Sequence, residues 1–129
     1  MPKKHVEGVA EEHLGRVRRI CRSMPGATER LSHGEPTFFV KKRTFTMFAN
    51  NHHNDGHIAV WIPALSGLQA ALIKTLPKTY FKPPYVGGAG WIGIDLDQIS
   101  DQDLAEHIFE AWHLIESKKG KSRTAKKRR

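Results

Sequence analysis

The chain has 129 residues, a formal net charge of +8 at pH 7 and 39% hydrophobic residues. This length suits one domain with a core of its own, and the hydrophobic content excludes a wholly disordered chain. A single cysteine, Cys21, excludes an internal disulfide, and no apolar run approaches the roughly 18 residues that a membrane span needs. The charged N-terminus lacks the apolar segment of a secretory signal, so we expect a soluble, cytoplasmic protein.

The positive charge is concentrated at the C-terminal end. Residues 117–129, SKKGKSRTAKKRR, contain eight of the 21 basic residues and no acidic residue. The remaining chain has 13 basic and 13 acidic residues and is formally neutral. We therefore predict one α+β domain over residues 1–116 and a basic, disordered tail over residues 117–129. Such a tail can bind phosphates, or it can be a solubilising terminus or a cellular address.

The predicted elements begin with a helix over residues 6–24, where apolar residues recur at spacings of three and four before Pro25-Gly26. Strand-like runs follow at residues 38–40, 44–49 and 57–62, separated by short polar turns. The remaining predicted elements are a helix over residues 66–76, strands at residues 79–81 and 91–96, and a helix from Ser100 to about Ile115.

This order of elements, α-β-β-β-α-β-β-α, predicts the fold class. Because the strands mostly join through links of hairpin length, we expect a two-layer α+β fold. Its sheet would have five mostly antiparallel strands with three helices packed on one side. Alternation would point these residues toward the helices: Phe38, Val40, Phe45, Met47, Ile58, Val60 and Ile62. The opposite side would receive Phe39, Thr44, Thr46, Phe48 and Trp61.

The second side of the predicted sheet is aromatic, which is unusual for a surface in contact with water. Phe39, Phe48 and Trp61 could stack nucleic acid bases, or they could contact a second copy of the chain or another protein. The same rings could also be core residues covered by another element, which is the commoner role of aromatic residues in strands.

Two connections carry residues that could contact phosphates. Lys41-Lys42-Arg43 lies between two strands, where three cations could bind a nucleic acid backbone or protect the sheet edge. The glycine-rich loop from Pro83 to Gly90 has Lys82, Tyr85 and Trp91 at its margins and could form a second projection. Residues 88–93 match G-x-G-x-x-G, but they lead into a strand instead of a helix, so we predict no dinucleotide site.

A group of polar residues surrounds the turn before the third strand. This constellation of unknown role comprises His33, Glu35, His52, His53, Asn54, Asp55 and His57. Imidazole and carboxylate groups could bind zinc or iron. A structural polar turn is nevertheless favoured, because Asp-Gly is typical of turns. The spacing of His53 and His57 would place both side chains on one face of a helix, but it has no such effect in a turn. We therefore predict no metal, no cofactor and no catalytic residue.

Three blocks of the sequence resemble the MmcQ/YjbR family of small bacterial proteins. They are LSHGEPTF at residues 31–38, FANNHHNDG at residues 48–56, and PPYVG followed by GWIG within residues 83–93. The resemblance covers roughly residues 13–117. It implies a two-layer α+β fold like that of the secretion chaperones, without established catalytic residues. The family is described as predicted DNA-binding proteins with two hairpin wings, which would correspond here to residues 41–43 and 83–91.

These observations predict a non-enzymatic DNA-binding protein that contacts the phosphate backbone. The residues expected at the nucleic acid are Lys41, Lys42, Arg43, Lys82, Tyr85, Trp91, Lys118, Lys119, Lys121, Arg123, Lys126, Lys127, Arg128 and Arg129. Two alternatives stay open. One is a chaperone-like module that binds a protein or peptide through the aromatic side of the sheet, and the other is a small His-rich metal-binding enzyme.

Overall fold

The computed structural model describes the backbone of residues 2–51 and 56–118, and the side chains of this region from residue 8 onward. Its helices are α1 (Pro2–Arg22), α2 (Leu68–Thr75) and α3 (Asp101–Glu116). The strands are β1 (Thr28–Ser32), β2 (Glu35–Val40), β3 (Arg43–Asn50), β4 (Ile58–Ile62), β5 (Tyr80–Phe81) and β6 (Ile92–Asp95). Two short 3-10 turns, η2 (Val86–Ala89) and η3 (Leu96–Gln98), flank β6.

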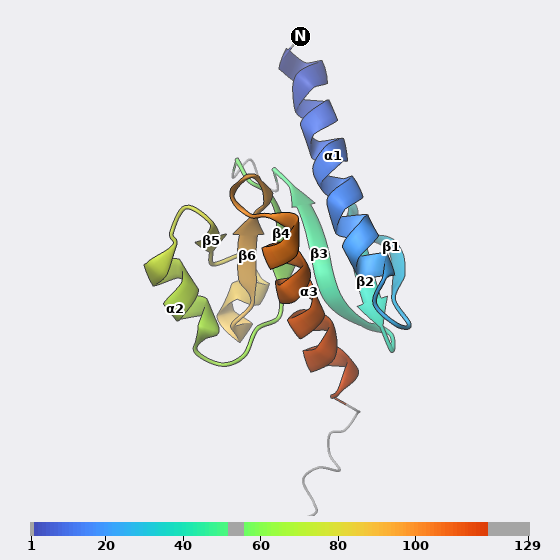
Figure 1. Cartoon of the computed structure of the whole chain (residues 1–129), viewed down its shortest axis with the longest axis vertical. Coiled ribbons are helices and arrows are strands. Elements are labelled where there is room, and N and C mark those ends of the chain that lie inside the picture. The colour runs from blue at the N-terminus through green and yellow to red at the C-terminus, as the bar shows by residue number, and fades with distance from the viewer. Residues whose placement is uncertain (1, 52–55, 119–129) are drawn as a thin grey trace, which may run out of the picture.

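The strands form one sheet in the order β1-β2-β3-β4-β6-β5, and every neighbouring pair is antiparallel. Helices α1 and α3 lie across one face of this sheet, and α2 packs beside the β5 edge (Figure 1). The α+β class and the three helices are therefore confirmed. We call the face that α1 and α3 cover the helix face, and the other the open face.

The prediction of five strands is wrong, because the sheet has six. The missed strand is β1, whose sequence TERLS has two adjacent charged residues, one apolar residue and no alternating apolar pattern. Glu29 is held there by ion pairs with Arg18 and Arg22 of α1, and Leu31 is 70% exposed at the sheet edge. Pairing with β2, and not local hydrophobicity, makes this segment a strand. The order is corrected to α-β-β-β-β-α-β-β-α.

The predicted division of side chains between the two faces is also partly wrong. The pairing of β2 with β3 shifts by one residue, since Phe38 is opposite Thr46 whereas Phe39 is opposite Thr44. Phe45 is thus an extra residue in β3, which is a β-bulge. Beyond the bulge the alternation is inverted relative to the simple pattern.

The bulge puts three residues on the side opposite to the predicted one. Thr46, which is opposite Phe38, and Phe48 lie on the helix face, whereas Met47 packs with Trp61 on the open face. Phe39 lies on the open face under the guanidinium group of Arg30, 3.9 Å from its ring centroid. Phe39 and Trp61 therefore lie on the open face and Phe48 in the core, although Phe48 also lines the pocket described below. A partner at these three residues stays a prediction.

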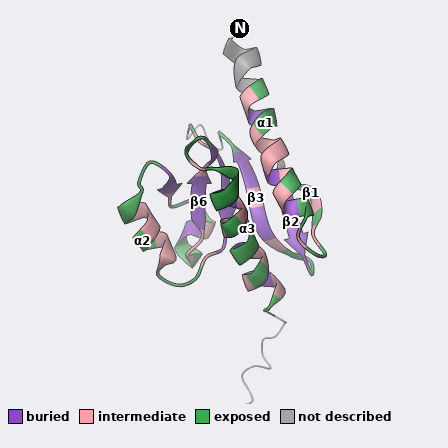
Figure 2. Ribbon diagram, in the orientation of Figure 1, coloured by how far each residue is buried: buried purple, intermediate pink, exposed green. Residues whose placement is uncertain are grey.

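The main core lies between the helix face and α1 and α3, and Figure 2 shows the buried residues concentrated in the strands. It includes Val17 and Cys21 of α1 and Leu104 and Ile108 of α3, each fully buried. Burial raises the pKa of the Cys21 thiol to about 12, so this thiol is neutral and unreactive. Within the described part of the chain, no helix has both the length and the apolar character of a membrane span.

Candidate functional site

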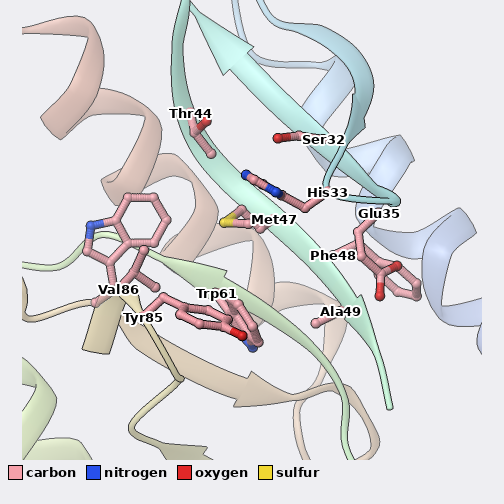
Figure 3. Close-up of a pocket in the computed structure, with 11 residues that line it drawn as sticks. Ser32, His33, Glu35, Thr44, Met47, Phe48, Ala49, Trp61, Tyr85 and Val86 are labelled. Carbon is pink, nitrogen blue, oxygen red and sulfur yellow. The ribbon is translucent and has the colours of Figure 1, made fainter. Parts of the chain in front are cut away.

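The open face carries a pocket of about 570 Å³, a size typical of small-molecule sites. Figure 3 shows the labelled side chains of the β1–β2 hairpin on one side, Tyr85 and Val86 on the other, and Met47 and Trp61 between them. The lining residues are Ser32, His33, Glu35, Thr44, Met47, Phe48, Ala49, Trp61, Tyr85, Val86 and Trp91.

The floor of the pocket is built by strand register. Met47 of β3 is directly opposite Trp61 of β4, which is in turn opposite Gly93 of β6. A side chain at Gly93 would overlap the ring of Phe81, because an added Cβ would lie 2.4 Å from two of its atoms. The glycine lets Phe81 lie against the sheet beside Trp61, and together with Met47 these residues form a continuous apolar surface.

One wall is the tight turn between β1 and β2. His33 and Gly34 have φ of 54° and 82°, and Ser32 pairs with Glu35, which is the geometry of a two-residue type I′ hairpin. The Glu35 carboxylate accepts a hydrogen bond from the Asn50 backbone N–H at 3.1 Å, which joins this turn to the end of β3. The wall is polar, because it presents a hydroxyl, an imidazole and a carboxylate.

The opposite wall is the loop before β6. Tyr85 has φ 62° and ψ −68°, and the Val86 N–H donates to the Pro84 carbonyl at 2.6 Å, which forms a strained three-residue γ-turn. The side-chain amide of Gln69 in α2 donates to the carbonyls of Gly87 (2.9 Å) and Trp91 (2.6 Å). Helix α2 thereby holds an apolar wall against the pocket.

Three of the residues predicted at a wing, Lys41, Lys42 and Arg43, lie at the β2–β3 turn. Lys41 and Lys42 both have positive φ, 53° and 69°, so this is another two-residue turn. The Lys41 Nζ lies 3.3 Å from the Glu116 carbonyl oxygen and 3.5 Å from its carboxylate. Lys42 and Arg43 are exposed and form no ion pair within the described residues.

The contact with Glu116 places the β2–β3 turn at the end of α3, as Figure 1 also shows. The exposed Lys118 follows that end directly. Because Lys41 pairs with Glu116, we call Lys42, Arg43 and Lys118 the basic pole. The other predicted contacts of the basic segment, Lys119, Lys121, Arg123, Lys126, Lys127, Arg128 and Arg129, lie outside the described residues.

The arginines of α1 are held by acidic residues and do not add to this pole. Arg16 and Arg19 pair with Asp101, while Arg18 donates three hydrogen bonds to the Glu29 carboxylate. The hydrogen bond from Arg18 lowers the pKa of Glu29, and the same bond raises the pKa of Arg18. These arginines bind α1 to β1 and α3, which is a structural role.

The predicted polar constellation is divided. His33 and Glu35 lie at the pocket, whereas His57 lies elsewhere, 3.1 Å from the Asp95 carboxylate and stacked on Phe81. His52, His53, Asn54 and Asp55 lie outside the described residues. Within the residues that the structure describes, no group of three or more His, Cys, Asp and Glu could hold a metal ion.

The residues of the second predicted wing are also divided between different surroundings. Tyr85 and Trp91 line the pocket, and Lys82 is exposed at the start of the same loop. Ser32, Met47 and Val86 also line the pocket, although the sequence did not indicate them as site residues. Ser32 and Val86 belong to the sequence blocks described above, which is a signal that could have found them. Met47 had no such signal, because the bulge reverses its side.

The three blocks converge in space, since eight of the eleven lining residues belong to them. The YjbR family model matches residues 22–114. The chain belongs to the YjbR family. Among curated proteins, none matches this sequence.

A solved YjbR-like structure supports the same fold. The crystal structure of Deinococcus radiodurans protein DR2400, with family-model domain DUF419, superposes with a TM-score of 0.69 and 15% identity. The match covers 83% of this chain and 80% of that one. At this identity the likeness concerns the fold alone.

Proposed function

We propose that this YjbR family member is a non-enzymatic DNA-binding protein that contacts the phosphate backbone through the basic pole and the adjoining basic segment. The observation that carries the proposal is the contact between Lys41 and Glu116, because it brings the basic turn to the point where residues 117–129 begin. The exposed Lys42 and Arg43 of this turn and Lys118 thus lie at one end of the domain.

The balance of charge in the rest of the chain makes this end the natural contact. Residues 1–116 are formally neutral, and the α1 arginines are occupied by Asp101 and Glu29. A polyanion is therefore attracted mainly to the basic pole and its adjoining segment. Backbone contacts of this kind position a protein on DNA and carry no sequence information directly.

The proposal predicts how duplex binding depends on salt. We expect the Lys42→Ala/Arg43→Ala double variant to lower the slope of log K against log salt by roughly 2, since each phosphate contact contributes about 0.9. The measurement is a titration of a duplex oligonucleotide by the full chain over about 50 to 200 mM salt.

A matched control removes the same charge elsewhere. Lys74→Ala/Lys78→Ala alters two exposed lysines beside β5, at the sheet edge remote from β2 and β3, and should keep the wild-type slope. Wild-type binding that is insensitive to salt, or an equal effect of both double variants, would contradict the proposal.

A further inference from the structure

We infer that the pocket on the open face binds an unpaired nucleobase. This inference rests on the proposed DNA binding and extends it, because phosphate contacts alone leave the pocket without a role. Its ligand would be the base of a single-stranded nucleotide, because a base stacked and paired in a duplex cannot enter a pocket.

One wall of the pocket suits the flat face of a base, and the other suits its polar edge. Val86, Trp91 and Tyr85 give one wall apolar and aromatic surface, on which the face of a base can stack. Ser32 and His33 give the other wall polar groups that can hydrogen-bond the edge of the base. A purely apolar ligand would form no hydrogen bonds with Ser32 and His33.

The floor of the pocket is apolar. Trp61 and Ala49 line it, although each is only 2% exposed. Met47 is half-buried beside Trp61, and its flexible thioether can adapt to different ring shapes. Such a surface accepts any base through its ring face, which indicates little sequence preference.

A cation lies on the open face close to the pocket residue Thr44. It is not Arg43, the neighbour of Thr44, because Arg43 is opposite the core residue Val40 and so lies on the helix face. Arg30 lies on the open face over Phe39, which is opposite Thr44, and it forms no ion pair within the described residues. Charge complementarity therefore supports a nucleic acid strand as the occupant.

The test compares three ligands of equal length with the full chain at one salt concentration: a single-stranded oligonucleotide, the same strand without its bases, and the duplex. We expect the single strand to bind at least about fivefold more tightly than the abasic strand, since one stacked base contributes at least that factor. Equal affinity for the two strands would overturn the inference, and it would leave the proposed function intact if both still bind in a salt-dependent manner.

Variants of the two walls locate the effect. Trp91→Ala and His33→Asn should each lower the ratio of single-strand to abasic affinity toward one, without changing duplex affinity. His33→Asn removes the imidazole and keeps a residue that suits the positive φ of this turn.

The control is Trp112→Phe, because Trp112 packs near Pro25 on the helix side. If Trp91→Ala fails to fold, Tyr85→Ala replaces it, because Tyr85 is 74% exposed. An unchanged ratio in the wall variants would overturn the inference.

A separate arm distinguishes the source of the base. Adenosine and thymidine are titrated against the wild type and Trp91→Ala, with tryptophan fluorescence as the readout. A fluorescence change only in the wild type, without binding of any strand, would support a base pocket that serves free nucleosides and would contradict the proposed DNA binding. If neither nucleosides nor the single strand change the fluorescence, the inference fails.

Discussion

At the scale of single residues, the open face depends on a glycine that admits an aromatic ring. An added Cβ at Gly93 would meet three atoms of the Phe81 ring at 2.4 to 2.7 Å, which real side chains do not tolerate. Phe81 also stacks on His57, with centroids 4.0 Å apart, so the ring has little space in which to retreat. The close packing of Phe81 against the sheet therefore depends on the lack of a side chain at Gly93.

We expect Gly93→Ala to destabilise the protein by about 1–3 kcal/mol, because overpacking forces the Phe81 ring and its neighbours to move. Urea unfolding followed by circular dichroism measures this change. Gly88→Ala is the matched control, since nothing lies within 4 Å of its added Cβ, and its effect should stay within about 0.5 kcal/mol. Equal stability of Gly93→Ala and the wild type would show that the floor can rearrange.

At the scale of elements, β1 is attached to α1 by charge more than by apolar packing. Arg18 donates three hydrogen bonds to the Glu29 carboxylate, at 3.1 Å to Oε1 and at 3.0 and 2.8 Å to Oε2. Arg22 adds a fourth, to Oε1. Glu29 is largely shielded from water, with a side-chain exposure of 16%, whereas Arg22 is mostly exposed. Two-point contact of this kind holds a carboxylate more firmly than a single surface ion pair.

The pH dependence of stability should report this attachment. The pKa of Glu29 is lowered in the folded protein, so its stabilising effect is complete above its unfolded pKa of about 4.3 and is lost as pH falls through the lower folded value. We expect Glu29→Gln to cost about 1 kcal/mol at pH 7 and to flatten this acid loss, as measured by urea unfolding at several pH values. Glu12→Gln on the exposed side of α1 should change stability little. An equal acid loss in Glu29→Gln and the wild type would contradict the role of Glu29.

At the scale of the whole molecule, residues 1–116 are formally neutral, and the exposed Lys42 and Arg43 lie together at one turn. Folding holds this turn beside the end of α3. A ligand stabilises a protein only by the difference between its affinities for the folded and unfolded chains. Thermal stabilisation by DNA therefore reports contacts that depend on the folded arrangement of the pole.

We expect saturating duplex DNA at low salt to raise the melting temperature of the wild type, and to raise it less in Lys42→Ala/Arg43→Ala. A ligand at 100 times its Kd stabilises a protein by roughly 2.7 kcal/mol if it does not bind the unfolded chain. We expect a smaller gain in stability here, because DNA also binds the unfolded chain. Differential scanning fluorimetry with and without DNA provides the measurement. If DNA binds without any shift, the basic segment acts alone and the pole has no role.

Local patterns predicted much of the framework. The apolar repeat of α1 and the start of α3 at Ser100 are visible in the sequence, and the structure confirms them. The three blocks also indicated the family before any comparison. These features depend on residues a few positions apart, whose physical preferences operate within one helix turn or one strand.

The pocket was decided only by the tertiary structure. Its walls come from residues 32–35 and 85–91, far apart in the chain, and its floor depends on a bulge at Phe45 that sends Met47 to the open face. Strand β1 likewise exists because β2 pairs with it. Such features arise from register between distant strands, and a shift of one residue reverses every side chain beyond it without leaving a local signal in the sequence.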